Sequence, residues 1–306
     1  MNKTAIEWTD VTWNPTSGCR KISPGCKNCY AKRLWPRVYP DRPFEYVREH
    51  PDRLPQPLRM RQPKRIFVDS MSDLFIDAVS FSFIDHVFAI MALTPQHTYQ
   101  ILTKRPERML QYMEALMSGR RLVIECARWA GKNDRDRKDV ARQKVRVQKA
   151  MAAFGANIEE APREPLRNVY LGVSAENQET YNERAEILAR TPAAIRFISF
   201  EPLLESIDPG NGFDSPPTFD GPYYDIHLAI VGGEAGRGAR PMDWEWPIDI
   251  YYATRAAGKA FFMKQGSQAT DGKKYKDFDS FPELLRVREQ PIYDGPDRLP
   301  RIMKLA

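Results

Sequence analysis

The chain has 306 residues, 42% of them hydrophobic and 28% charged, which is the composition of a soluble globular protein with enough residues to bury a core. Its net charge of +6 hints at a polyanionic partner, but residues 132–149 hold eight lysines and arginines against three aspartates, so a generally basic nucleic-acid-binding surface is not supported. The amino terminus has no apolar signal segment, and no apolar run is long enough to cross a membrane, so we expect a cytoplasmic protein.

Six short apolar runs, each followed at once by polar residues, are expected to be strands. They occupy residues 65–68, 99–102, 169–173, 195–199, 228–231 and 260–263, and a further strand is expected within residues 6–13. Helical patterns lie between them at residues 81–93, 106–117, 178–190 and 244–257. Strands that alternate with helices of this length indicate βαβ units and a parallel sheet.

Two segments depart from this alternation. Residues 38–64 are rich in proline and arginine and are expected to form an extended loop. Residues 119–167 form an insertion whose middle has the pattern of a basic, solvated helix. The sequence contains no internal repeat, and we expect a single domain over residues 1–306.

The expected fold is a full or partial (β/α)6–8 barrel of the TIM type with parallel strands, and the alternative is an open, doubly wound α/β sheet. In a (β/α) barrel the active site lies at the carboxyl ends of the strands. Polar side chains follow every expected strand, so we expect them to line one shared cavity. The residues of this set that we assign to catalysis are Asp69, Ser72, Asp73, Lys104 and Glu201.

Three of the four cysteines lie within eleven residues, at Cys19, Cys26 and Cys29, with the spacing C-x6-C-x2-C. Glycine and proline between them allow residues 14–33 to fold as a loop around a compact metal centre. This clustering argues against a disulfide framework and favours reduced thiols. Basic neighbours would favour the thiolate form and offset the charge of a bound cluster. These neighbours are Arg20, Lys21 and Lys27.

The number of cysteines bears on the kind of metal centre. A structural zinc site normally has four ligands. The remaining cysteine, Cys126, lies among apolar residues and is expected to be a buried small hydrophobe. Three thiolates without a fourth ligand are what a four-iron cluster with one open iron requires. The alternative stays open: a non-catalytic zinc-binding protein that recognises nucleic acid and uses the same three cysteines with Cys126.

The cysteine loop resembles that of the radical S-adenosylmethionine (radical SAM) superfamily, in which a C-x3-C-x2-C loop follows the first barrel strand. Here the first gap has six residues, and Tyr30 follows the third cysteine, which is similar to the spore photoproduct lyase branch. Apart from the basic insertion, nearly the whole chain also resembles a phage-associated protein family of unknown function. The matching segments are Trp13-Asn14-Pro15, Gly25-Cys26-x2-Cys29-Tyr30, residues 69–75, residues 102–106, residues 171–174, Glu176-Asn177, residues 200–203 and residues 231–234.

The superfamily resemblance implies a 4Fe-4S cluster whose open iron binds S-adenosylmethionine, and an electron donor as a partner. Reductive cleavage of S-adenosylmethionine would give a 5′-deoxyadenosyl radical that modifies a substrate. The phage association, the loop similar to that of photoproduct lyases and the basic insertion favour a nucleic acid or nucleotide substrate, while a peptide or small metabolite stays open. No membrane partner is expected.

The same resemblance implies that polar groups at strand ends hold the cofactor. Ser174 and Glu176 would bind the ribose hydroxyls, although Ser174 and Asn177 would equally suit a helix N-cap. In the segment Gly232-Gly233-Glu234, the glycines would let the backbone approach the methionine moiety or the adenine, and the glutamate would bind an ammonium group. The alternative for this segment is a tight turn with an acidic helix start.

Overall fold

The computed structural model describes residues 1–118, 129, 164–210, 213, 225–267, 276–295 and 300–305. The strands of the main sheet are β1 (Asn2–Lys3), β2 (Val11–Trp13), β5 (Arg65–Val68), β6 (Thr98–Thr103), β7 (Val169–Ser174), β8 (Ile195–Phe200), β9 (Leu228–Gly232) and β10 (Ala260–Gln265). The α-helices described are α1 (Tyr30–Val38), α2 (Phe81–Ala92), α3 (Pro106–Met117), α6 (Gln178–Arg190) and α7 (Glu245–Ala256).

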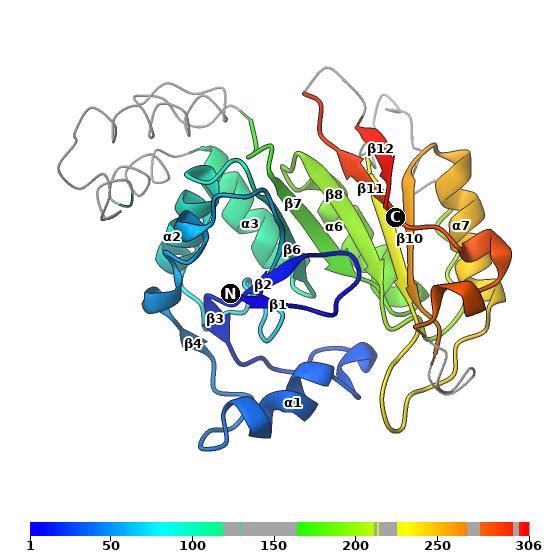
Figure 1. Cartoon of the computed structure of the whole chain (residues 1–306), viewed down its shortest axis with the longest axis horizontal. Helices are drawn as coiled ribbons and strands as arrows, with labels where there is room; N and C mark the ends of the chain where they lie inside the picture. The colour runs from blue at the N-terminus through cyan, green and yellow to red at the C-terminus, as the bar shows by residue number, and fades with distance from the viewer. Residues whose placement is uncertain are drawn as a thin grey trace.

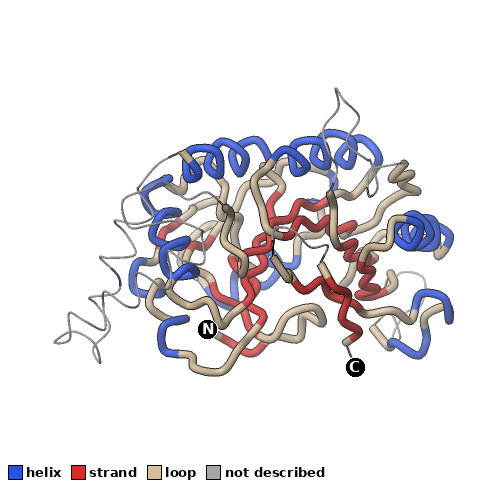
Figure 2. The backbone as a smooth tube through the Cα atoms, turned by 90° about the horizontal axis from the view of Figure 1, so that it is seen from above, coloured by secondary structure: helices blue, strands red, loops and turns tan. Residues whose placement is uncertain are grey.

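The main sheet has the strand order β1-β2-β5-β6-β7-β8-β9-β10. From β2 to β10 every neighbouring pair is parallel, and only β1 runs antiparallel to its neighbour. The strands follow chain order without the reversal that a doubly wound sheet requires. Figure 2 shows the strands along a curve with most helices around its outer side. The expected parallel α/β sheet is therefore present as a half-barrel whose first and last strands are β1 and β10.

The expected helices and strands after residue 64 are confirmed, because their boundary signals are local. Ser80 caps α2 by accepting a hydrogen bond from the Phe83 amide (3.2 Å). Asn177 and Thr180 form a capping box at the start of α6. Pro106 occupies the first turn of α3, where a missing N–H costs nothing. These caps account for helix bounds that lie within about one residue of those expected, whereas β10 ends two residues later than expected.

The region before residue 64 differs more from expectation. Only Val11–Trp13 of the expected strand at residues 6–13 is extended, because the Asp10 carboxylate turns back to accept a hydrogen bond from the Arg65 amide (2.8 Å). The expected loop at 38–64 contains β4 (Arg48–Glu49), which pairs with β3 (Thr16–Ser17). The short 3-10 turns described along the chain are Pro24–Cys26, Pro51–Arg53, Pro57–Arg59, Phe278–Ser280 and Glu283–Leu285.

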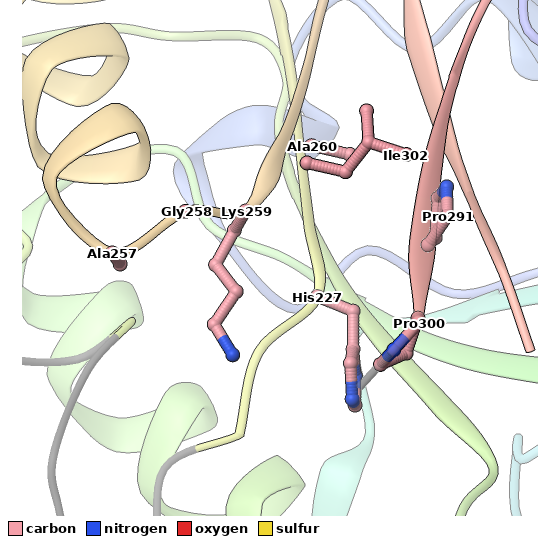
Figure 3. Close-up of a pocket in the computed structure, with 8 residues that line it drawn as sticks. All are labelled: His227, Ala257, Gly258, Lys259, Ala260, Pro291, Pro300 and Ile302. Carbon is pink, nitrogen blue, oxygen red and sulfur yellow. The ribbon is translucent and has the colours of Figure 1, made fainter. Parts of the chain in front are cut away.

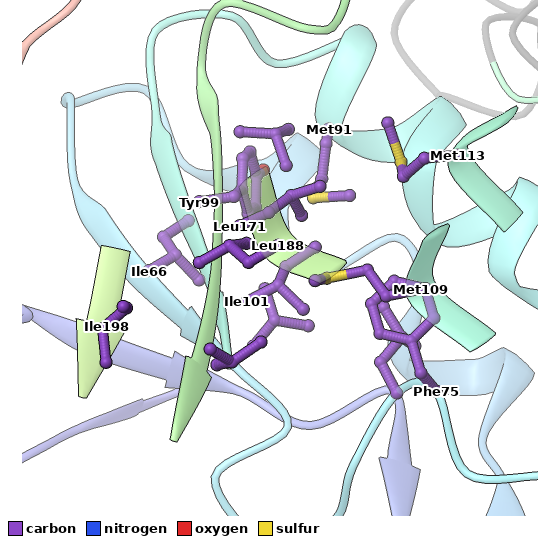
Figure 4. Close-up of a cluster of buried hydrophobic side chains, with 14 of the residues drawn as sticks. Ile66, Phe75, Met91, Tyr99, Ile101, Met109, Met113, Leu171, Leu188 and Ile198 are labelled. Carbon is purple, nitrogen blue, oxygen red and sulfur yellow. The ribbon is translucent and has the colours of Figure 1, made fainter. Parts of the chain in front are cut away.

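The outer face of the sheet packs against the helices. Alternate strand residues point outward, and Figure 4 shows Ile66, Tyr99 and Leu171 of the strands beside Met109 and Leu188 of the helices. All five side chains are at most 1% exposed. The strands therefore form a rigid support for the residues at their ends.

The concave face changes character along each strand. Toward the amino ends it holds an apolar cluster that includes Trp8, Phe67, Phe197 and Phe262. This cluster is covered by the antiparallel hairpin of β11 (Glu289–Ile292) and β12 (Arg301–Lys304), and the Tyr170 hydroxyl donates a hydrogen bond to the Pro291 carbonyl (3.0 Å). Toward the carboxyl ends, the same face continues from Phe197 to Ser199 and Glu201, two and four residues further along.

Other expectations fall partly or wholly outside the described residues. The basic helix within residues 119–167 is one, since only residues 129 and 164–167 of that insertion are described. Cys126 is another. Among the described helices, none is both long and apolar enough to cross a membrane.

Candidate metal centre

The cysteine loop lies at the carboxyl ends of the parallel strands. Figure 1 shows α1, which follows the loop, on the side toward which the arrows of β7 and β8 point. The loop is attached there by Gly18, whose amide donates to the Met71 carbonyl (3.2 Å) and whose carbonyl accepts from the Ser72 hydroxyl (2.7 Å). Gly18 has φ +89°, and a Cβ atom on it would lie 2.4 Å from the Tyr46 carbonyl oxygen. Only glycine fits this start of the loop.

Glu176 holds the middle of the loop. Its side chain is fully buried just after β7, and its Oε1 accepts a hydrogen bond from the Gly25 amide (3.1 Å). Its Oε2 lies 3.0 Å from both Lys104 Nζ and Arg184 Nη1. Burial alone would raise the pKa of Glu176, but these two cations hold it below its ordinary value. Glu176 is therefore a charged anchor that joins the loop to β6, β7 and α6.

Glu234 holds the end of the loop in the same way. Its Oε2 accepts from the side-chain amide of Asn28 (2.8 Å), which lies between the second and third cysteines. Arg240 pairs with both oxygens of Glu234, and its Nη2 also donates to the Pro24 carbonyl (3.1 Å). Burial would raise the pKa of Glu234, but the bonds from Arg240 and Asn28 lower it. A second buried carboxylate thus fixes the loop from the end of β9.

Arg105 contacts the first cysteine directly. Its Nη1 donates to Asp73 Oδ2 (2.8 Å) and lies 3.9 Å from Cys19 Sγ, and its Nη2 donates to the Arg20 carbonyl (3.0 Å). Asp73 also accepts from the Thr103 hydroxyl (2.7 Å) and from the Lys104 amide (3.1 Å). Asp73 therefore orients the guanidinium that faces the thiol.

The three cysteines are free thiols and half-buried. Burial raises the pKa of Cys19 to about 12, and the charge of Asp73 adds to this. Burial acts in the same direction on Cys26, but backbone hydrogen bonds and the charge of Lys104 bring its pKa below the ordinary value. Cys19 and Cys29 pack against the same small apolar cluster. The loop therefore holds thiols of different acidity side by side with two cations.

A family model described as a protein of unknown function (DUF5131) matches residues 3–289, which is nearly the whole chain. The chain belongs to the DUF5131 family. The match runs from β1 through the cysteine loop and the main sheet to the first residue of β11. No curated protein and no solved structure matches the chain.

In this DUF5131 chain, Tyr30 connects the loop to the segment after β5. Its hydroxyl donates to the Ser70 carbonyl. Burial of that hydroxyl, with Cys29 and Glu201 close by, raises the pKa of Tyr30. Glu201 in turn forms an ion pair with Lys264 near the end of β10. The residue that follows the third cysteine is therefore fixed to the segment after β5.

Asp69 differs from the other predicted site residues because its backbone is in the left-handed region, with φ 60°. Such a conformation is unfavourable for a residue with a Cβ atom and clusters at functional sites. Its Oδ1 accepts from the Thr16 amide (2.9 Å), and burial raises its pKa to about 7. Asp69 thus links the end of β5 to the segment that leads into the cysteine loop.

The structure brings most of the predicted residues together around the cysteine loop. Glu176 and Glu234, predicted to bind the cofactor, pair with arginines and Lys104 and hold the loop. Ser72 and Asp73, predicted to be catalytic, form hydrogen bonds with the loop and with Arg105. Opposite charges at the strand ends therefore pair with one another, and the roles of these residues toward a cofactor or substrate stay predictions.

Local geometry bears on two further residues, Ser174 and Gly233, and shows that Ser174 is not the N-cap of α6. Asn177 caps α6, whereas Ser174 is the last residue of β7 and its carbonyl accepts from Arg184 (2.8 Å). Gly233 packs against protein backbone, because a Cβ atom on it would lie 2.5 Å from the Ser267 amide nitrogen. Its close approach therefore serves a contact between β9 and the chain after β10.

A pocket of about 40 Å³ lies at the opposite end of the sheet (Figure 3). Its lining includes His227 and Ala260, which stand at the amino ends of β9 and β10, and Pro291 and Ile302 of the hairpin. It is far too small for a cofactor of the size of S-adenosylmethionine. The geometry of the cysteine loop, and not this pocket, therefore identifies the candidate site.

Several residues that build the site were not assigned from the sequence. Asn28 could have been noted from its position between two cysteines. Arg184 carried a clearer signal, since it falls on the buried side of α6 beside Tyr181 and Leu188. Arg240 follows an irregular glycine-rich segment and had no such signal. Ser199, inside an expected apolar strand, has a buried hydroxyl without a hydrogen-bond partner among the described residues.

Proposed function

We propose that the chain is a radical SAM-type enzyme in which Cys19, Cys26 and Cys29 hold a 4Fe-4S cluster. One observation carries this proposal. A loop with three free thiols is anchored by Glu176 and Glu234 to the carboxyl ends of a curled parallel sheet, where enzymes built on (β/α) barrels carry their active sites. When bound, the cluster would supply one electron to break a sulfonium bond of S-adenosylmethionine, yielding methionine and a 5′-deoxyadenosyl radical that takes hydrogen from the substrate.

The donor set fits a cluster with one open iron. Three thiols are available in the loop. His50 would be a possible fourth ligand. It is buried, however, and shares a 2.7 Å hydrogen bond with the Ser17 hydroxyl, so its ring is already engaged. Among the described residues, no three histidine, cysteine, aspartate or glutamate side chains are grouped so that they could hold one metal ion as they stand. Thiolates that each bind a different iron of one cluster need not converge on a single point.

The charges beside the loop suit a negatively charged centre. Lys104 lowers the pKa of Cys26, and Arg105 directs an N–H toward Cys19. Cys26 is therefore deprotonated before Cys19 as the pH rises. Because metal ligation requires thiolates, loading the loop releases the Cys19 proton. Hydrogen bonds to a ligating sulfur from second-layer residues such as Arg105 stabilise its negative charge.

The concave face at the carboxyl ends of the strands offers groups that could bind S-adenosylmethionine itself. The unpartnered hydroxyl of Ser199 would gain a hydrogen bond from a polar ligand or a water. At Gly232 a Cβ atom would meet only side-chain atoms of Gln265 and Glu201, at 3.4 and 3.5 Å. The protein's own packing therefore does not demand glycine there, and we assign Gly232 and Ser199 to the cofactor, together with Ser174, which is the partner of Ser199 in the register of β7 and β8. A nucleic acid or nucleotide remains the proposed substrate.

Metal analysis tests this proposal. Protein purified under nitrogen should be brown and contain about four irons and four sulfides per chain. Cys26→Ala should abolish the iron, whereas Cys126→Ala, the control outside the loop, should keep it. A colourless protein with one zinc per chain, lost in both variants, would overturn the proposal in favour of the zinc alternative. Chemically reduced, cluster-loaded protein should then form 5′-deoxyadenosine from S-adenosylmethionine.

A further inference from the structure

Helix α1 exposes an apolar stripe beside the cysteine loop. Tyr30, Leu34 and Val38 are 43%, 42% and 53% exposed, and their spacing of four residues places them along one side of the helix. The other side of α1 buries Ala31 and Trp35. The described part of the chain has eight exposed large hydrophobic residues, and five of them lie within residues 22–46. These five are the three residues of the helix together with Ile22 and Tyr46. We call Tyr30, Leu34 and Val38 the α1 stripe.

Positive charge is concentrated in the segment of the chain that contains the α1 stripe. Residues 18–48 contain eight lysines and arginines against two acidic residues. Seven of the eight basic residues are exposed: Arg20, Lys21, Lys27, Lys32, Arg33, Arg37 and Arg48. The excess of six charges equals the net charge of the whole chain. The basic segment at 132–149 is therefore not the only concentration of positive charge, and this second one adjoins the cysteines.

The combination of an apolar stripe with nearby positive charge favours one kind of binding partner over the others. A second copy of the chain would set two positive surfaces against each other, which is unfavourable. A nucleic acid would use the basic residues, but it stacks on aromatic rings and would gain little from Leu34 and Val38. A membrane-bound helix needs a broader apolar face than three residues on a nine-residue helix. A protein with an apolar centre and an acidic rim matches both features.

The α1 stripe is also connected to the metal centre. The ring of Tyr30 is exposed on the stripe, while its hydroxyl lies close to Cys29. A protein bound to α1 would therefore stand close to the cysteine loop. Under the proposed function, the centre must receive one electron from outside the chain for each cleavage.

We propose that the α1 stripe and the basic residues of its segment are the docking surface for an acidic electron-donor protein. This inference rests on the proposed function. A reduced acidic flavoprotein would dock there and lose one electron, and the cluster would gain that electron. Charge attraction would speed the encounter, and the apolar stripe would hold the complex.

The test uses the cluster-loaded full chain and a reduced acidic flavodoxin as the probe. The rate of cluster reduction is followed by the loss of visible absorbance at low and high salt. Leu34→Glu and Arg37→Glu should each slow reduction at least tenfold at low salt, and the wild-type rate should fall as salt rises. Ile302→Glu and Arg190→Glu are matched controls, since these side chains are 39% and 54% exposed and lie away from the loop. Both controls should keep the wild-type rate.

Dithionite and iron analysis separate this inference from the proposed function. All four variants should contain as much iron as the wild-type protein, and dithionite should reduce them at the wild-type rate. If Leu34→Glu or Arg37→Glu loses iron, Val38→Glu is used in its place. If the wild-type protein holds no iron, the proposed function fails. If iron is present and the α1 variants accept electrons from flavodoxin at the wild-type rate, the docking inference alone is wrong. Loss of single-stranded DNA binding in the α1 variants, with flavodoxin reduction unchanged, would also overturn it in favour of nucleic acid.

Discussion

At the amino ends of the strands the concave face is packed with apolar side chains, whereas at the carboxyl ends it carries charged and small ones. Both ends contain buried carboxylates paired with basic residues. At the amino end, Asp225 lies 2.8 Å from Lys259 and 2.9 Å from His227, and Glu289 binds Arg255 through both oxygens. These pairs join parts of the sheet, the hairpin and α7, so the charges at this end serve stability.

At the carboxyl end, equivalent pairs hold the cysteine loop, which between Gly18 and Cys29 contains only the short 3-10 turn Pro24–Cys26. Glu176 and Glu234 bind the cysteine loop, and Asp73 orients Arg105 toward Cys19. Similar ion pairs therefore have different purposes at the two ends of one sheet. The comparison teaches that a buried ion pair points to a functional site when it fixes reactive groups, and to stability when it fixes other structural elements.

The largest expected effect comes from comparing two buried glutamates. Glu176→Gln should lower the free energy of unfolding by about 3–5 kcal/mol, because it leaves the buried Arg184 and the half-buried Lys104 without their partner. Glu289→Gln at the amino end should lower it by less, because it leaves only Arg255, which is partly exposed. Only the first variant should also lose iron, since only Glu176 binds the loop. Denaturant titration and iron analysis check this, and iron loss in both variants would remove the distinction between the ends.

A smaller effect concerns Asp69, whose pKa of about 7 lies above that of the unfolded chain. Between these two values the folded protein holds a proton that the unfolded chain has released, so stability falls as pH rises. At most 1.36 kcal/mol is lost per pH unit, which gives about 2.5 kcal/mol between pH 5 and pH 7. Asp69→Asn should remove this loss, and denaturant titrations at both pH values measure it. An unchanged pH dependence in the variant would contradict the assignment.

At the amino end, Asp225 gives stability the opposite dependence on pH. Burial would raise the pKa of Asp225, but hydrogen bonds from His227 and Lys259 hold it below its ordinary value. Its contribution is therefore present above the unfolded pKa and is lost as the pH falls below that value.

The smallest expected effects on stability come from substituting two adjacent glycines, Gly232 and Gly233. Gly233→Ala should lower stability by about 1–3 kcal/mol, because its Cβ atom would lie 2.5 Å from the Ser267 amide nitrogen. Gly232→Ala should change stability by less than about 1 kcal/mol, because its Cβ atom would make only ordinary contacts. Under the proposed function, Gly232→Ala should instead weaken binding of S-adenosylmethionine. Thermal unfolding and calorimetric titration of cluster-loaded protein measure the two quantities.

The half-barrel was largely predictable because its signals are local. The bounds of α3 and α6 follow from a proline in the first turn and from a capping box. The polar residues expected after each strand do lie at the carboxyl ends, where the cysteine loop is anchored. The hairpin β11–β12 was missed, since its strands are short and one contains Pro291, which weakens a strand pattern.

The pairing inside the candidate site could not be predicted in the same way. Glu176 and Glu234 were assigned to the cofactor, and their contacts with the cysteine loop were not predicted. Their actual partners, Gly25 and Asn28, lie 151 and 206 residues away in the chain. No local pattern specifies such contacts, because they depend on how the strands and the loop meet in space.

These long separations set the order in which the site can form during synthesis. The three cysteines leave the ribosome among the first thirty residues, but the carboxylates that anchor them are made only after more than half of the chain has appeared. Until then the cysteine loop lacks its contacts with Glu176 and Glu234. Such non-local contacts form late in folding. The completed loop therefore requires that the chain be made at least as far as Glu234. Under the proposed function, cofactor insertion into the anchored site would follow translation of β9.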